Sequence, residues 1–179
     1  NQVPQVAVMS TDLADILRFC ISPDEFVPLR REIEILERYT EIQRIRLSGA
    51  FTLEVDVPEE LQNCPVPKMI LQPIAENAIL HGLEGVENGC IRVSAAQRDG
   101  VLEIAVSDNG RGLPEDMKGP FRHRDQERDR GHLGLYNVHT ILQKHYGERF
   151  GLYLEDGPDG RGAVVRATLP LRRGEESKC

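Results

Sequence analysis

The strongest constraint on the fold is a pair of hairpin signals in the second half of the chain. Asp99-Gly100 separates two segments in which apolar and polar residues alternate, and Asp159-Gly160 separates another such pair. Alternation with a period of two is typical of half-buried strands, and an Asp-Gly dipeptide between strands favours a tight turn. Each pair is therefore expected to be antiparallel. The apolar positions of the first pair are Ile91, Val93 and Ala95, then Leu102, Ile104 and Val106, and the second pair covers 151–155 and 163–169.

Two helices are expected before the first strand. Ser10 or Thr11 is a candidate cap for a short helix that Ser22-Pro23 ends, and Pro28 opens a longer helix that runs to Leu47. The longer helix carries two adjacent apolar rows, which favour packing against another helix on one side and a domain on the other. An ordinary amphipathic helix lying on a single core is the alternative interpretation. The rows are Leu29, Ile33, Leu36, Thr40, Gln43 and Leu47, and Ile35, Tyr39 and Ile42.

The remaining elements predict the fold class. A strand over 50–57 ends at Pro58, and helices are expected over 67–83 and 135–146. The stretch 112–131 has no usable period, and a loop of that length within a compact domain is usually functional. Grouped strands with helices between them predict an α+β fold, in which helices cover one face of a mixed, largely antiparallel sheet in two layers.

Composition excludes several classes of protein. The chain has 179 residues and a formal net charge of −7, and its Lys and Arg residues form no cluster with aromatic residues. Nucleic acid is therefore not an expected partner. The four cysteines are scattered without metal-ligand spacing, which favours reduced thiols. No apolar run is long enough for a membrane span, and the chain begins at Asn1 without signal-peptide features, so we expect a fragment of a longer protein.

Common catalytic motifs are missing. The sequence has no phosphate-loop G-x-x-x-x-G-K-[ST], no G-x-G-x-x-G after a strand, no H-E-x-x-H and no G-x-S-x-G. His123-Arg124-Asp125 spells the catalytic tripeptide of protein kinases, but Arg130 stands where that motif needs Asn. We interpret this match as a coincidence.

Three pieces remain as candidates for a binding site. In Leu71–Gly82, helical spacing places Pro73, Asn77 and His81 on one face, although Asn77 is equally compatible with a satisfied core amide. In Ser107–Pro114, Asp108 ends a strand and precedes Gly110 and Gly112, which have no Cβ and so allow close approach of a flat ligand. In Arg130–Asn137, Gly131 and Gly134 precede a helix whose N-terminus favours phosphate.

These pieces, in this order, resemble the nucleotide-binding boxes of the Bergerat-fold (GHKL) ATPases, which include gyrase, MutL, heat-shock chaperones and histidine kinases. The segment Thr11–Leu47 resembles the region before the ATPase domain of LytS/YesM-like sensor histidine kinases, and the resemblance covers Leu13 to Pro170. It implies a helical segment over 1–47, an ATPase domain over 48–171 and a frayed tail over 172–179.

The resemblance also implies roles for single residues. Asn77 would hold the Mg²⁺ that bridges the ATP phosphates, and Asp108 would accept the adenine amino group. Glu76 would be the carboxylate nearest the metal or the transferred phosphate, and therefore the candidate catalytic residue. A mobile lid would cover Lys118 to Arg130. The other nucleotide-binding residues would be His81, Gly110, Gly112, Gly131, Leu133 and Gly134.

Four positions depart from the family pattern. Pro73 stands where gyrase-like members carry a catalytic Glu, and Leu80 replaces a frequent Lys that faces phosphate. His132 replaces a usual Gly, and Ala163 replaces a usual Thr. These changes predict weak ATP binding and slow hydrolysis. Pro73, Leu80 and His132 also motivate an alternative function, a non-catalytic nucleotide-binding module, while an anti-sigma-factor-type serine kinase is a more distant alternative.

The resemblance implies phosphoryl transfer from Mg·ATP to a histidine, and then to a response regulator. In this family the acceptor lies in a P-H-F context, which none of the histidines has, so we expect the acceptor outside this chain. The complete protein would be a homodimeric receptor of the bacterial inner membrane with this part in the cytoplasm. The histidines are His81, His123, His132, His139 and His145.

Overall fold

The structure is a computed structural model, and it describes residues 2–47, 51–121 and 133–172. In this part of the chain, six strands form one sheet in the order β2-β4-β5-β8-β7-β6. Neighbouring strands are antiparallel except β2 and β4, which run parallel. The strands are β2 (Phe51–Asp56), β4 (Gly89–Arg98), β5 (Val101–Asp108), β6 (Gly119–Pro120), β7 (Gly151–Asp156) and β8 (Ala163–Pro170).

Both predicted hairpins are confirmed. Arg98 pairs with Val101 across the first turn, and Asp99 and Gly100 have φ values of 48° and 76°. A two-residue hairpin turn of this hand needs positive φ at both positions, which Asp tolerates and Gly adopts without strain. In the second hairpin, β7 pairs with β8 and a short 3₁₀ turn, Pro158–Gly160, joins them.

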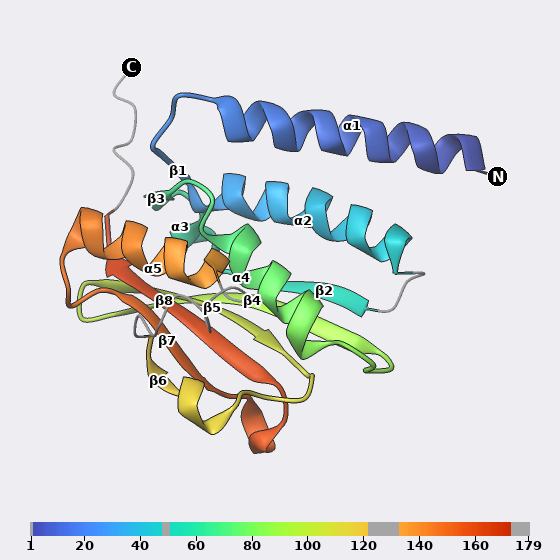
Figure 1. Cartoon of the computed structure of the whole chain (residues 1–179). Coiled ribbons are helices and arrows are strands. Elements are labelled where there is room, and N and C mark those ends of the chain that lie inside the picture. The colour runs from blue at the N-terminus through green and yellow to red at the C-terminus, as the bar shows by residue number, and fades with distance from the viewer. Residues whose placement is uncertain (1, 48–50, 122–132, 173–179) are drawn as a thin grey trace.

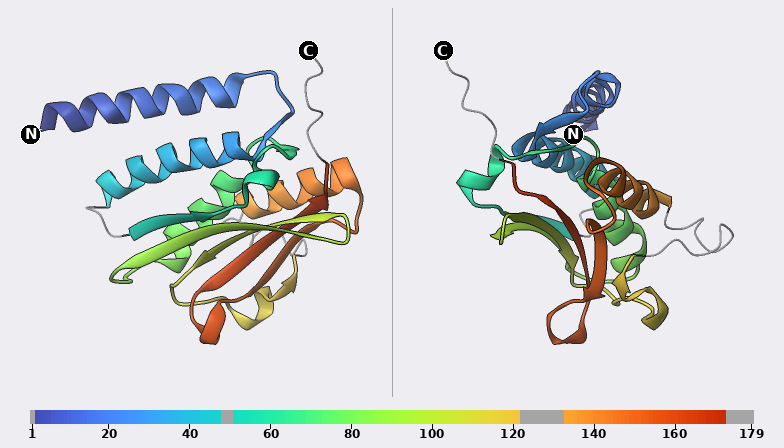
Figure 2. Two further views of the ribbon diagram at one scale, coloured as in Figure 1. Left: turned by 180° about the vertical axis from the view of Figure 1, so that it is seen from behind. Right: turned by 90° about the vertical axis from the view of Figure 1, so that its left-hand side faces the viewer.

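Helices cover one face of the sheet, which confirms the α+β fold class. Figures 1 and 2 show α2 (Leu29–Arg46), α4 (Leu71–Asn77) and α5 (Leu133–Tyr146) over this face, with α1 (Gln2–Ile21) on the far side of α2. The predicted packing of α2 on two sides is thus confirmed, since α2 contacts α1 as well as α4 and β2. None of the described helices is long and apolar enough to cross a membrane.

Several predicted boundaries are wrong. Ser10 and Thr11 lie inside α1, which begins at Gln2, so neither is its cap. The predicted helix over 67–83 begins only at Leu71, because Pro65–Pro67 form strand β3, which pairs antiparallel with β1 (Phe26–Pro28). The stretch 112–131, in which no period was found, contains a 3₁₀ turn, Glu115–Met117, and the edge strand β6.

The core lies between the sheet and its helices. Fully buried residues come from α2, α4, α5 and the central strands, and Leu36, Ile74 and Leu142 are examples. The predicted strand over 50–57 is an edge strand in which Phe51 is buried and Val55 is 40% exposed. The short helix α3 (Glu59–Gln62) follows it. This arrangement places the C-terminal half of α4 against the end of β5, where the predicted site residues meet.

Candidate nucleotide site

One cavity brings together most of the predicted binding residues that the structure describes. Its volume is about 210 Å³. Small-molecule pockets usually measure roughly 300–1,000 Å³, so a cavity of this volume suits a flat base better than a whole nucleotide. The lining residues are Asn77, His81, Gly82, Asp108, Arg111, Gly112, Leu113, Pro114, Met117 and Ala163.

Asp108 is the buried carboxylate of this cavity. It ends β5 and is only 8% exposed. The backbone N–H groups of Gly110 and Ala163 donate to its Oδ1 at 2.8 and 3.4 Å. Burial raises the pKa of Asp108, while these two hydrogen bonds act in the opposite direction. Because both of these donors reach Oδ1, the carboxylate keeps accepting capacity at Oδ2 for a ligand donor.

Three glycines allow the backbone to close around this carboxylate. A Cβ on Gly82 would lie 2.8 Å from both Asp108 oxygens, and a Cβ on Gly110 would lie 2.1 Å from the Gly82 carbonyl oxygen. Gly162 has a φ of 67°, and its Cβ would lie 1.8 Å from the Asp108 carbonyl oxygen. The N–H of Gly162 donates to the Gly110 carbonyl at 2.9 Å. Side chains at these positions would push Asp108 out of place.

Asn77 and His81 reach the same cavity from the end of α4. The helix passes at Ala78 into a π-helical turn, η1 (Ala78–Gly82), and the N–H of Leu83 donates to the Ala78 carbonyl five residues earlier. A π-helical turn is rare and is often found at functional sites. The predicted helical face is thus confirmed for Asn77 and His81, whereas Pro73 lies one turn earlier and outside the cavity lining.

Arg111 fastens the loop after β5 to the end of η1. Its Nε donates to the His81 carbonyl at 2.8 Å, its backbone N–H donates to the Gly82 carbonyl at 3.2 Å, and its Nη2 pairs with Glu84 at 2.6 Å. These contacts join the end of η1 to the loop after β5, and Arg111 itself lines the cavity. Arg111 was not among the predicted site residues, and its position between Gly110 and Gly112 was the only signal in the sequence that could have indicated it.

Other predicted site residues lie away from the cavity lining. Glu76 is exposed, and its negative charge helps burial to raise the pKa of Tyr39 on α2 to about 12. Leu133 is 59% exposed. It is the first residue of α5, which begins two residues earlier than the predicted helix over 135–146. Gly134 packs on α4, since its Cβ would lie 3.1 Å from the Cβ of Pro73. The roles given to these residues stay predictions.

The predicted lid is described only at its start. Lys118 pairs with Asp156 at 2.7 Å and with Glu115 at 2.6 Å, and Gly119 and Pro120 pair with β7. The predicted lid therefore begins within the sheet edge. The rest of the predicted lid, after Phe121, lies outside the described residues, and so do Gly131 and His132, which follow the lid.

Leu80 lies in a different hollow from Asn77. Together with Ile79 and Leu83 it lines a second, mainly apolar cavity of about 510 Å³ beside the end of α2. A Lys at position 80 was expected to face phosphate. In this structure the Leu80 side chain lines this second cavity and is absent from the lining of the Asn77 cavity, and the phosphate-facing role of a Lys at this position stays a prediction.

The described residues suit a metal ion whose other binding partners are the phosphate oxygens of the nucleotide and water. Within ranges 2–47, 51–121 and 133–172 no cluster of three or more His, Cys, Asp or Glu residues could hold a metal ion. Mg²⁺ is commonly bound through one or two protein oxygens together with substrate phosphates and water. The Asn77 side chain is a neutral oxygen donor of that kind, and it lines the cavity.

Sequence comparisons agree with this geometry. Residues 66–173 match the family model described as histidine kinase-, DNA gyrase B- and HSP90-like ATPase, and residues 1–51 match the histidine kinase model. The chain is 33% identical over 174 residues to the sensor histidine kinase YesM of Bacillus subtilis, and this match covers 96% of the chain. It is 30% identical over 158 residues to the sensor protein LytS of Oceanobacillus iheyensis, which covers 85% of the chain. The chain spans only 29% and 26% of these relatives.

Solved structures share the fold. The catalytic domain of the histidine kinase ThkA superposes with a TM-score of 0.62 at 18% identity, over 82% of this chain and 95% of that domain. ThkA has also been solved in complex with the response regulator protein TrrA, and that structure matches 97% of this chain and 50% of the ThkA chain, with a TM-score of 0.58. On its family match, the chain belongs to the histidine kinase-, DNA gyrase B- and HSP90-like ATPases, and the relatives that it resembles over most of its length are sensor histidine kinases.

Proposed function

We propose that the cavity between α4 and β5 binds the adenine of Mg·ATP. The observation that carries the proposal is the buried Asp108 carboxylate, which lies among Gly82, Gly110 and Gly162 with accepting capacity at Oδ2. An acceptor at this place fits the amino group of adenine, whereas guanine presents a carbonyl oxygen at the equivalent position of its ring. The family match supports ATP as the ligand.

The other roles come from the resemblance to the family, and the placement of Asn77 and His81 at the cavity supports the roles of those two residues. Asn77 would contribute the protein oxygen for Mg²⁺, and His81 would line the wall beside the base. Gly110 and Gly112 would let the loop after β5 pass close to the ring. Gly131, Leu133 and Gly134 would contribute the phosphate-facing turn at the start of α5, because a helix N-terminus favours anions. Glu76 would be the carboxylate nearest the transferred phosphoryl group.

The complete protein would use this site for phosphoryl transfer to a histidine outside the present chain, and then to a response regulator. Such transfer depends on positioning and charge neutralisation more than on covalent chemistry by the protein. The ThkA complex with a response regulator supports this partner class. We further propose that residues 1–47 belong to a dimerisation region, that 48–171 form the ATPase domain, and that the whole is the cytoplasmic part of a membrane receptor.

The alternatives differ from this proposal at identifiable points. A non-catalytic module of the same fold would bind nucleotide but would never support transfer when the acceptor region is supplied. A serine kinase of the anti-sigma type would not need residues 1–47, and the match of 1–51 to the histidine kinase model favours the sensor kinase.

Calorimetric titration tests the proposal. Mg·ADP should bind the chain weakly, and clearly more tightly than Mg·GDP. Asp108→Asn is the matched variant, since it should abolish that preference while keeping the size of the side chain. Equal affinity of the native chain for the two nucleotides, or no binding of either, would show that the site has been assigned wrongly.

A further inference from the structure

Glu32 is a buried carboxylate on α2 that caps the start of a different helix, α4. It is only 3% exposed. Its Oε1 accepts the N–H of Met69 at 2.7 Å, and its Oε2 accepts the N–H groups of Ile70 and Leu71 at 2.9 and 3.0 Å. The first N–H groups of a helix have no partner within the helix, and its N-terminus favours negative charge. Glu32 therefore supplies what the start of α4 lacks.

The capped turn has a strained backbone. Met69 has a φ of 66°, a conformation that residues with a Cβ rarely adopt. Such strain persists only where surrounding contacts enforce it, and it often marks a functional position. Here the bond from the Met69 N–H to Glu32 holds the strained residue. Burial raises the pKa of Glu32, against the effect of the three N–H donors and Lys68, so the carboxyl group is kept buried at a cost in desolvation.

The residue before this turn holds the end of α1. Lys68 Nζ donates to the carbonyl oxygens of Phe19, Cys20 and Ser22 at 3.1, 3.3 and 2.6 Å. It also lies 5.6 Å from the centre of the Phe19 ring, within reach of a cation–π interaction. A cation is favourable at the C-terminus of a helix, where carbonyl groups are unpaired.

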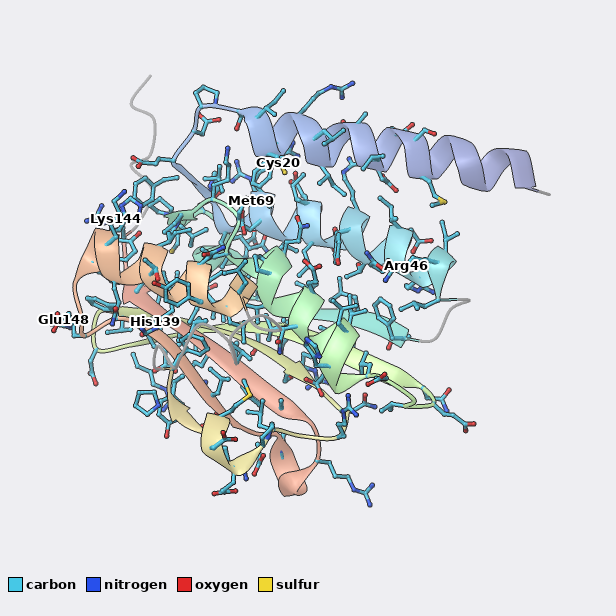
Figure 3. All side chains as sticks on the ribbon, viewed as in Figure 1. Cys20, Arg46, Met69, His139, Lys144 and Glu148 are labelled. Atoms are coloured by element: carbon cyan, nitrogen blue, oxygen red, sulfur yellow. The ribbon has the colours of Figure 1, made fainter. Side chains whose placement is uncertain are left out.

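Figure 3 shows Cys20 at the end of α1 and Met69 below it, and their sulfur atoms are 3.9 Å apart. The same short segment is also bonded to the residue before β1, because the N–H of Lys68 donates to the Glu25 carbonyl at 3.0 Å. Residues 68–71 thus contact the end of α1 and the first turn of α2, and they lead into the start of α4. From Leu71 the helix α4 continues for two turns to Asn77 at the cavity.

We propose that Glu32 is a positioning residue for Asn77, and that Lys68 links the end of α1 to the same turn, so that the position of α1 sets how well the site binds the metal–phosphate part of the nucleotide. This inference rests on the proposed function of Asn77. Asp108 lies on β5 and meets the α4 segment only at its far end, at Gly82, so the binding of adenine should depend on Glu32 less than the binding of the metal–phosphate part does. Because coupling between two sites is reciprocal, nucleotide binding must also alter the turn and the end of α1.

The first experiment compares adenosine with Mg·ADP in the full 179-residue chain. In Glu32→Gln an amide NH₂ replaces one accepting oxygen, so at least one N–H of the turn loses its acceptor. The Kd for Mg·ADP should rise about fivefold or more, the lower end of typical coupling between sites. The Kd for adenosine should rise clearly less than the Kd for Mg·ADP. Glu37→Gln, on the exposed side of the same helix, is the control and should change neither value.

The second experiment follows backbone amide signals by NMR. In the native chain, Mg·ADP should shift the amides of Met69, Ile70 and Leu71 and also that of Ser22. In Lys68→Met the shift at Ser22 should disappear while the shifts at 69–71 remain. This comparison stands even if Glu32→Gln fails to fold, because the Lys68 substitution leaves the carboxylate cap intact.

The outcomes separate the two proposals. If the folded Glu32→Gln variant binds both ligands as the native chain does, or loses both equally, the positioning role is refuted. A response at Ser22 that persists in Lys68→Met refutes the link to α1. If the native chain binds Mg·ADP no better than adenosine, the role of Asn77 fails first and this inference fails with it.

Discussion

Gly82 presses against the carboxylate of Asp108 so closely that a methyl group at residue 82 would lie 2.8 Å from both carboxylate oxygens. Gly82→Ala should therefore displace Asp108 from its hydrogen bonds and weaken ADP binding. Overpacking of this kind typically lowers the free energy of unfolding by roughly 1–3 kcal/mol. Calorimetric titration measures the loss of ADP affinity. Gly100→Ala in the exposed hairpin turn is the control, because it is strained at a φ of 76° but meets nothing within 4 Å, so it should lower stability and leave ADP affinity unchanged.

Asp108 and Asn77 should affect different parts of the ligand. Asp108→Asn should weaken adenosine and Mg·ADP alike, because the amide also presents donors to the adenine amino group. Asn77→Ala should weaken Mg·ADP and leave adenosine nearly unchanged, because its proposed partner is the metal. Titration of both ligands into both variants checks this division. Identical losses in the two variants would mean that the roles have been assigned wrongly.

The raised pKa of Asp108 predicts a pH dependence of binding. The free carboxyl group holds its proton at pH values above the usual 3.8, whereas an adenine amino group needs an accepting oxygen. ADP affinity should therefore fall as the pH is lowered from neutral through this raised pKa. The raised pKa also makes the free energy of unfolding depend on pH. The stabilisation by protonated Asp108 is fully present below pH 3.8 and is lost as the pH rises through the folded-state pKa. Affinity measured against pH tests the prediction, and Asp108→Asn should remove the dependence.

His139 predicts a pH effect on stability of the opposite direction. Its Nδ1 accepts the Leu152 N–H at 3.1 Å, which requires the neutral ring, and burial lowers its pKa below 6.5. Its contribution is present above 6.5 and is lost as the pH falls through the folded-state pKa. His139→Ala should cost about 1–3 kcal/mol at neutral pH, because the Leu152 N–H loses its acceptor. Denaturant unfolding at several pH values measures both effects. If the free energy of unfolding of the variant changed with pH as steeply as that of the native chain, the assignment would be contradicted.

The chain alone should not become phosphorylated on its described histidines. His139 is engaged with Leu152, His145 stacks edge-on against Phe26 at 4.9 Å, and His81 lines the nucleotide cavity. Incubation with radiolabelled ATP should therefore leave the chain unlabelled, with very slow turnover of ATP. Supplying the acceptor region of the complete protein should restore acid-labile labelling. Strong labelling of the isolated chain at any histidine would contradict the proposal that the acceptor lies elsewhere.

Local spacing determined which side chains share a face. The Asp99-Gly100 turn, the two apolar rows of α2 and the common side of Asn77 and His81 each depend on residues within a few positions of one another. The period of a helix or strand fixes such relations without tertiary information. The order of the nucleotide-binding boxes also pointed correctly to the family.

Only the tertiary structure decided how distant segments meet. Glu32 accepts N–H groups 37 to 39 residues away, β2 runs parallel to β4, and Gly82 presses on Asp108 from another element. On the sequence Glu32 is one more charged residue of an amphipathic helix, and nothing near it shows that α4 begins without a cap of its own. These contacts depend on long-range packing, in which a buried polar group must find a partner wherever the fold brings one.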